Sequence, residues 1–281
     1  MEFVSAAAEG RYAALVRAAA ESVVGLDFDG TLSPIVDDPE QAHIHPDAAD
    51  VLVALAAQVR AVAVVTGRPA RQALDLGGLE EVADAVHASG KDLYVFGQYG
   101  NERWSSDQRR IVSPRPPAGL ATFERELPRV LREGDAADAW IEDKGLAVAV
   151  HTRRLPDPTA AFERLEGPVG DLARAHGLVV EPGRHVLEVR SPGMHKGQAV
   201  DTLVRLTGAS GLLFAGDDLG DVEAFEAVSA HGRSGAATLL VAVASEEQQA
   251  LVDRADVLVS GPDEVRKLLR TFTADAEALR A

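Results

Sequence analysis

The sequence predicts a doubly wound α/β core, built on a parallel β-sheet, with a smaller α+β module inserted between its two halves. Three observations support this fold class. Short apolar runs alternate with helical patterns near both ends of the chain, a proline-rich stretch at 112–117 interrupts them, and a pattern of one helix and two strands then occurs twice. The length of 281 residues also exceeds the usual size of one hydrophobic core, so one large or two unequal domains are expected.

The predicted core consists of alternating strands and helices. Buried parallel strands are typically short, continuous apolar runs, because helices cover both faces of such a sheet. Five runs bounded by glycine, aspartate or serine fit this description: 23–26, 62–65, 211–215, 239–243 and 257–259. Apolar residues at helical spacing predict helices at 47–59, 196–206, 221–228 and 263–269. The alanine-rich N-terminus is helical in character, and the tail at 271–281 is expected to be a frayed helix end.

The prolines at 112–117 exclude a central strand or a helix interior, and the inserted module begins there. Its predicted elements are a helix at 119–132, strands at 139–142 and 146–151, a helix at 158–176, and strands at 178–181 and 185–190. Lys144-Gly145 and Pro182-Gly183-Arg184 provide the hairpin turns. The expected domains are therefore a core of 1–110 and 193–281 and an insertion of 111–192.

The composition indicates a folded, acidic protein. Hydrophobic residues make up 46% of the chain and charged residues 26%, which is ordinary for a globular protein. The formal net charge of −16 argues against nucleic acid as a partner, because binding a phosphate backbone requires clustered lysine and arginine. The lack of cysteine excludes disulfides, thiolate zinc sites and a cysteine nucleophile. No uninterrupted apolar segment indicates a membrane span or signal peptide, so a cytoplasmic location without a membrane partner is expected.

Two aspartates follow the first apolar run. Asp27 and Asp29 are two residues apart in an extended segment, so they can point into one site at the carboxyl end of a strand, where open parallel sheets bind ligands. Neighbouring carboxylates repel unless one is protonated or both face a metal, and oxygen-only ligands beside a phosphate suit Mg²⁺. The alternative is structural, because Asp29-Gly30 is a common turn pair and could simply end the strand.

Polar residues occur at three further corresponding positions. They are Thr66, Gly67 and Arg68 after the second run, Lys196 at the start of a helix, and Asp217, Asp218 and Asp221 after the third run. Each group also has an ordinary structural explanation as a turn, a solvated lysine or helix-capping carboxylates. Their coincidence favours a phosphoryl site, which needs a hydroxyl or amide donor, a cation and metal-binding carboxylates around one phosphate. Because so acidic a chain repels anions at long range, such a site must provide its own cations.

Four ordered motifs resemble those of the haloacid dehalogenase superfamily of phosphatases: Asp-x-Asp-Gly-Thr at 27–31, threonine before glycine at 66–67, a lysine at 196, and Gly-Asp-Asp-x-x-Asp at 216–221. Longer strings are similar to those of the trehalose-6-phosphate phosphatase family, at 26–36, 66–68, 97–100, 142–144, 188–190, 196–197 and 216–218, with His151 and Arg153. The resemblance implies a Rossmann-like, haloacid-dehalogenase-type core with an α+β cap that sets substrate specificity. It also implies Mg²⁺-dependent hydrolysis of trehalose 6-phosphate to trehalose and phosphate, the last step of trehalose biosynthesis.

The resemblance further implies roles for individual residues. Asp27 would attack phosphorus to form an aspartyl-phosphate, and Asp29 would protonate the leaving oxygen and then activate water. The other implied catalytic residues are Thr66 and Lys196. The implied metal site comprises Asp27, Asp29 through its carbonyl, and Asp217, with Asp218 and Asp221 orienting these ligands. The implied substrate-binding residues are Thr66, Gly67, Arg68, Glu142, Lys144, Arg153, Glu188 and Lys196.

The predicted sugar-binding residues lie in the inserted module. Glu142 and Lys144 share one face of a predicted strand, and Glu188 lies on another strand of the same small sheet. Carboxylates and an ammonium group together satisfy both the donors and the acceptors of sugar hydroxyls. An exposed Glu-x-Lys pair is also ordinary solvated surface, and only the resemblance favours contact with a sugar.

The sequence leaves two other functions open. Another phosphatase of the same superfamily, acting on sucrose phosphate or a glycosyl-phosphoglycerate, would share every core residue. A catalytically silent sensor would bind trehalose 6-phosphate without hydrolysing it, although it would need neither a nucleophile nor an acid. The expected partner is a small-molecule sugar phosphate, with functional pairing to a separate trehalose-6-phosphate synthase. The oligomeric state is open, a monomer being one possibility.

Overall fold

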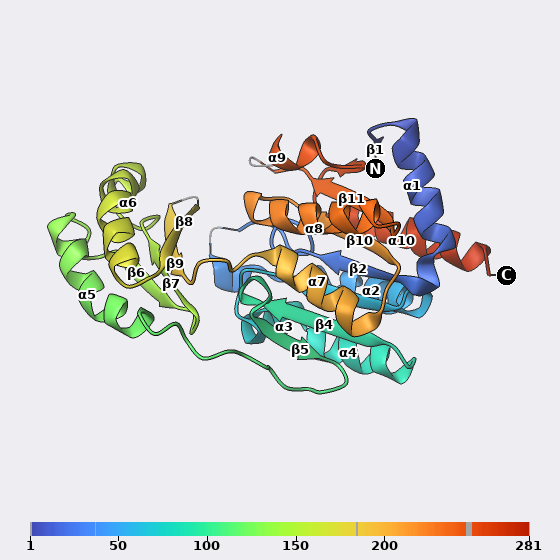
Figure 1. Cartoon of the computed structure of the whole chain (residues 1–281), viewed down its shortest axis with the longest axis horizontal. Helices are drawn as coiled ribbons and strands as arrows, with labels where there is room; N and C mark the ends of the chain where they lie inside the picture. The colour runs from blue at the N-terminus through green and yellow to red at the C-terminus, as the bar shows by residue number, and fades with distance from the viewer. Residues whose placement is uncertain (1, 37, 184, 246–248, 281) are drawn as a thin grey trace. The chain divides into compact units, whose positions relative to one another are not determined.

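The computed structural model of the protein describes residues 2–36, 38–183, 185–245 and 249–280. The chain divides into two compact units (Figure 1). Unit 1 consists of Met1–Ser113 and His195–Ala281, and unit 2 consists of Pro114–Met194. Within the described ranges, no helix is both long enough and apolar enough to cross a membrane.

Unit 1 is built on a sheet whose described strands follow the order β1-β12-β11-β10-β2-β3-β4-β5 (Figure 1). The strands from β12 to β4 run parallel, and the edge strands β1 and β5 pair antiparallel with their neighbours. The bounds are β1 (Glu2–Phe3), β2 (Ser22–Leu26), β3 (Ala61–Val65), β4 (Asp92–Gly97), β5 (Glu102–Ser105), β10 (Gly211–Gly216), β11 (Ala237–Val243) and β12 (Val257–Val259). The strand order reverses between β2 and β10, and open α/β sheets bind ligands at such a switch point.

Helices cover both faces of this sheet, as the fully buried central strands require. One face packs against α1 (Ala6–Arg17), α2 (Asp47–Gln58), α3 (Ala70–Gly77), α4 (Leu79–Ala88) and α10 (Pro262–Ala278). The other face packs against α7 (Lys196–Thr207), α8 (Val222–Arg233) and α9 (Gln249–Val252). Successive residues of β2 alternate between the two cores, since Val23 belongs to one and Val24 to the other. The doubly wound α/β fold predicted from the sequence is confirmed.

The predicted frayed tail is wrong for the described residues up to 280, because α10 continues to Ala278. Phe272 is fully buried and Ala276 nearly so. The Tyr12 hydroxyl of α1 donates a hydrogen bond of 2.6 Å to Asp275 Oδ2, and the ring of Tyr12 packs edge-on against Phe272. The last turns of α10 are therefore held by the N-terminal helix.

Unit 2 contains an antiparallel sheet in the order β6-β7-β9-β8, with two helices on one face. The bounds are α5 (Leu120–Glu133), β6 (Trp140–Asp143), β7 (Ala147–His151), α6 (Pro158–Ala175), β8 (Val179–Gly183) and β9 (Val186–Arg190). The turn between β6 and β7 includes Lys144-Gly145, and Gly145 adopts φ of +80°. The other predicted turn was Pro182-Gly183-Arg184. Pro182 and Gly183 are the last two residues of β8, and Arg184 lies outside the described residues.

Candidate active site

The predicted catalytic residues of unit 1 follow adjacent parallel strands. Asp27 comes directly after β2, Thr66 after β3 and Asp217 after β10. Because β2 lies between β3 and β10, the three side chains lie at one edge of the sheet, at the switch point. All three residues are at most 3% exposed.

A buried lysine joins the carboxylates at this edge. Lys196 is the first residue of α7 and is 3% exposed. Its ammonium group donates hydrogen bonds of 2.6 Å to Asp27 Oδ1 and 2.7 Å to Asp221 Oδ1, and lies 3.9 Å from Asp218 Oδ1. Burial lowers the pKa of Lys196, but Asp221 and Asp27 outweigh it and raise the pKa well above its usual value. The ammonium group therefore stays charged and restrains Asp27.

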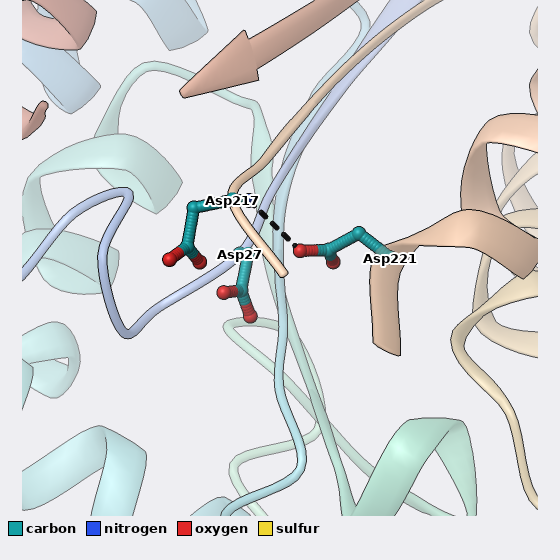
Figure 2. Close-up of side chains that lie close together, drawn as sticks. All are labelled: Asp27, Asp217 and Asp221. Atoms are coloured by element: carbon teal, nitrogen blue, oxygen red, sulfur yellow. Dashed lines mark hydrogen bonds between the residues drawn. The ribbon is translucent and has the colours of Figure 1, made fainter. Parts of the chain in front are cut away.

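Asp221 organises the loop after β10. Its Oδ2 accepts a hydrogen bond of 3.0 Å from the backbone amide of Asp217 (Figure 2). The same oxygen accepts one of 3.3 Å from the Asp218 amide, while Oδ1 binds Lys196. With both oxygens in use and no exposed surface, Asp221 fixes the position of its neighbours. The exposed share of the Asp218 side chain is 48%, which gives this carboxylate more freedom than Asp221 has.

Three carboxylates at this edge are close enough to share a cation. Asp27, Asp217 and Asp221 each place one oxygen within 4.8 Å of the others (Figure 2). Burial raises the pKa of Asp27 well above its usual range, because Lys196 opposes this effect only in part. Burial, with Asp218 and Asp221, raises the pKa of Asp217 to about 8. Such an excess of buried negative charge, built from oxygen ligands alone, fits a hard divalent cation such as Mg²⁺.

Gly30 allows the loop after β2 to approach Asp217. It adopts φ of +74°, and a β-carbon at this position would collide with the Asp217 carboxylate. The conformation therefore brings Gly30 against the Asp217 carboxylate, which the side chain of any other residue would displace.

Asp29 is held by Arg68, which the sequence predicts at the phosphate site together with Thr66 and Gly67. Arg68 Nε donates to Asp29 Oδ2 and Nη2 to Asp29 Oδ1, both at 2.7 Å, and Nη1 donates to the carbonyl of Pro39 at 2.9 Å. The Arg68 guanidinium also lies over the ring of Phe28. Both carboxylate oxygens of Asp29 are thus engaged by the Arg68 guanidinium.

Thr66 occupies a position suited to a phosphate donor. Its Oγ1 accepts a hydrogen bond of 3.1 Å from the backbone amide of Arg68. A hydroxyl that accepts one hydrogen bond can still donate one. Gly67, between them, has no side chain, and a β-carbon there would collide with the ring of Tyr99.

The predicted sugar residues of unit 2 form one ion pair and one hydrogen bond on its sheet. Lys144 Nζ donates a hydrogen bond of 2.6 Å to Glu188 Oε2, and both side chains are mostly buried. His151 Nε2 lies 2.9 Å from Glu142 Oε2. The other oxygen of Glu188, Oε1, is buried and accepts no hydrogen bond from the described residues. Arg153, in the segment after β7, is exposed.

Two contacts in the structure were not predicted from the sequence. One is the Arg68–Asp29 pair, which joins loops 39 residues apart and leaves no local signal. The other is the His151–Glu142 pair. Trp140 is opposite His151 in the β6–β7 register and stacks on it, so the Lys144-Gly145 turn could have revealed that Glu142 is the diagonal neighbour of His151.

The fold defines the structural class. It is similar to that of a haloacid dehalogenase-like hydrolase from Bacteroides thetaiotaomicron, which superposes with a TM-score of 0.64 at 14% identity, covering 89% of this chain and 98% of that one. The family model described as trehalose-phosphatase matches residues 25–84 and 131–257. The chain belongs to the trehalose-phosphatase family.

Two relatives show how the match is distributed. An uncharacterized glycosyl hydrolase of Mycobacterium tuberculosis is 38% identical over 216 residues, which are 73% of this chain and 15% of that protein. The chain thus spans only a small part of that relative's length. A probable trehalose-phosphate phosphatase of Oryza sativa is 30% identical over 295 residues, covering 96% of this chain and 75% of its own.

Proposed function

We propose that the chain hydrolyses trehalose 6-phosphate to trehalose and phosphate through an aspartyl-phosphate on Asp27. One observation carries the proposal: Lys196 is buried against Asp27 and Asp221 at the switch point of a chain that belongs to the trehalose-phosphatase family. A buried ammonium group on one oxygen of Asp27 restrains that carboxylate and leaves its other oxygen for attack on phosphorus.

In the proposed reaction, Asp27 forms a bond to phosphorus as the sugar oxygen leaves. Thr66 donates its hydroxyl to a phosphoryl oxygen, and Lys196 compensates negative charge. Asp29 protonates the leaving oxygen and then takes a proton from the water that cleaves the aspartyl-phosphate. Because Arg68 binds both oxygens of Asp29, this pair has to open before Asp29 can deliver a proton.

The metal ligands of the proposal are the carboxylates of Asp27 and Asp217 and the carbonyl of Asp29. Asp221 acts on them through the Asp217 amide and Lys196, and Asp218 remains free to orient bound water. Bound Mg²⁺ would neutralise the charge that develops on the phosphoryl oxygens.

We assign sugar recognition to unit 2, as its substrate-specificity module. Lys144 and Glu188 are fixed by their mutual ion pair, and Glu188 Oε1, which lies 3.9 Å from Arg190 Nη1, is a buried acceptor for a sugar hydroxyl. Glu142 is oriented by His151, and the exposed Arg153 is the remaining proposed contact. A trehalose-6-phosphate synthase would be the source of the substrate.

A panel of phosphorylated sugars with Mg²⁺ tests the substrate. Phosphate release should be fastest from trehalose 6-phosphate, compared with sucrose 6-phosphate, a glucosyl-phosphoglycerate and glucose 6-phosphate. A preference for another phosphorylated sugar would show that the proposed substrate is wrong, while the proposed phosphatase reaction would stand.

The nucleophile is tested by Asp27→Asn alongside the parent, each assayed with Mg²⁺ and with EDTA. We expect release only from the parent with Mg²⁺. Binding of trehalose 6-phosphate without release by the parent would instead identify a sensor.

A further inference from the structure

The segment that follows β4 bends sharply beside the loop carrying Thr66. Gln98 and Tyr99 adopt φ of +49° and +58°, a left-handed conformation that residues other than glycine rarely adopt. Both lie in a 3₁₀ turn (Gln98–Gly100) between β4 and β5. Two successive residues in this region persist only where the surrounding structure enforces them, and such positions are common at functional sites.

This turn is hydrogen-bonded to the Thr66 loop. The amide of Gln98 donates to the carbonyl of Arg68 at 2.8 Å, and the amide of Tyr99 donates to the carbonyl of Thr66 at 3.0 Å. Farther along, Glu102 Oε2 accepts a hydrogen bond of 2.7 Å from the amide of Ala70, the first residue of α3. Three bonds therefore fix the chain from Thr66 to Ala70 onto the turn and β5.

The side chain of Tyr99 lies across Gly67. A β-carbon on Gly67 would be 2.8 Å from both Cζ and the hydroxyl oxygen of Tyr99, closer than real side chains approach. On the other side of the turn, Gly100 packs against Ala199 of α7, the helix that begins with Lys196. The turn thus contacts both the loop that carries Thr66 and the helix α7 that begins with Lys196, the two proposed phosphate-binding residues.

We propose that Tyr99 is a positioning residue for the phosphate site. Its left-handed backbone and its ring on Gly67 hold the Thr66–Arg68 loop where the Thr66 hydroxyl meets a phosphoryl oxygen. This proposal rests on the proposed phosphatase function, but it concerns the phosphate rather than the sugar. A displacement of about 1 Å in such a loop can reduce turnover by about a hundredfold.

The test is a double-mutant cycle between Tyr99→Gly and Gly67→Ala. Glycine keeps the left-handed backbone and its amide bond but removes the ring. Gly67→Ala adds a methyl group where the ring lies. Each single variant should lose about tenfold or more in kcat/KM for trehalose 6-phosphate and in affinity for inorganic phosphate measured by calorimetry with Mg²⁺. In the Tyr99→Gly background, Gly67→Ala should cost less than about twofold, because the ring is gone.

Two further variants separate positioning from folding. Tyr99→Phe keeps the ring and should recover most of the kcat/KM and phosphate affinity that Tyr99→Gly loses. Asp135→Gly removes another left-handed non-glycine residue, at the end of α5, and should change neither. A purely structural role for Tyr99 would lower the melting temperature and the active fraction while leaving the phosphate affinity of the folded protein unchanged.

The proposal would be overturned if Tyr99→Gly had the same phosphate affinity and kcat/KM as the parent. It would also be overturned if Gly67→Ala reduced both quantities by the same factor in the parent and in Tyr99→Gly. If the parent binds phosphate but does not hydrolyse trehalose 6-phosphate, the proposed function fails and the affinities still decide the role of Tyr99. A parent that neither hydrolyses the sugar phosphate nor binds phosphate overturns both.

Discussion

At the scale of single residues, Lys196 balances a group of carboxylates that would otherwise repel. Its two short bonds to Asp27 and Asp221 are the only hydrogen bonds from an ammonium group to this group among the described residues. The sequence predicted Lys196 in the same phosphoryl site as Asp27, because a chain with a net charge of −16 must meet an anionic substrate with local cations. It could not show that Asp221 would be the second acceptor, because this depends on how the turn after β10 folds back.

The Arg68–Asp29 pair leads to a prediction about the leaving group. If Arg68 acts by placing Asp29, Arg68→Ala should impair hydrolysis of trehalose 6-phosphate, whose alkoxide must be protonated, more than that of p-nitrophenyl phosphate, whose leaving group needs no proton. Asp29→Asn should show the same pattern, with a loss of about a hundredfold or more on the sugar phosphate. Steady-state kinetics with both substrates measure the effect.

The control for this prediction is Arg71→Ala, which removes an exposed arginine three residues farther along that is paired with Glu80. It should leave both activities unchanged. Equal losses on the two substrates in Arg68→Ala would show that Arg68 binds the phosphoryl group instead.

The raised pKa of Asp217 predicts how stability depends on pH and metal. Its pKa is about 8 in the folded protein against a usual 3.8, so the folded state holds an extra proton between these values. Without metal, the free energy of unfolding should therefore decrease as pH rises from about 4 to about 8. Because Mg²⁺ needs the ionised carboxylate, its stabilising effect should increase over the same range. Urea unfolding at several pH values, with EDTA or Mg²⁺, measures both trends.

Asp217→Asn is the matched variant for the pH prediction. The amide cannot titrate, so the decrease of stability with pH should become shallower and the effect of Mg²⁺ weaker. An identical pH profile in parent and variant would mean that another group is responsible.

At the scale of elements, the strands beside the switch point were predictable because they are buried on both faces and appear as uninterrupted apolar runs. The pair β4–β5 was not predicted. The apolar run of β4 is short, at 93–96, and it follows the polar, half-buried Asp92. Helices α3 and α4 meet at Gly77-Gly78, and each is too short to show a long helical period. The segment that carries Tyr99 thus escaped prediction together with its strands.

The end of α10 provides a stability test at this scale. Phe272 is fully buried beside Tyr12, so Phe272→Ala should reduce the free energy of unfolding by about 3–5 kcal/mol. Thr271→Ala, at the exposed neighbouring position, should change it by less than about 0.5 kcal/mol. Chemical denaturation measures both, and a small effect of Phe272→Ala would indicate that the helix end does fray.

At the scale of the whole molecule, the proposed function divides two chemical tasks between the two units. Every proposed catalytic and metal-binding residue belongs to unit 1, and the proposed sugar contacts Glu142, Lys144, Arg153 and Glu188 belong to unit 2. The sequence motifs identify the first group through residues that chemistry requires at strand ends. For the second group, residue types alone were ambiguous, and burial distinguishes only the Lys144–Glu188 pair from solvated surface.

This separation predicts opposite substrate patterns for variants in the two units. Glu188→Gln leaves the buried Lys144 without its carboxylate and changes the acceptor offered to a sugar hydroxyl, so KM for trehalose 6-phosphate should rise about tenfold or more. Hydrolysis of p-nitrophenyl phosphate, which has no sugar, should be unaffected. Asp27→Asn should abolish both activities.

Glu166→Gln, an exposed change on α6, serves as the control in unit 2 and should leave both substrates unaffected. The melting temperature of Glu188→Gln reports whether unit 2 still folds. A folded variant that loses both activities equally would place Glu188 in the phosphoryl chemistry. One that loses neither would remove it from sugar recognition, and the specificity of the protein would then have to depend on Glu142 and its partner His151.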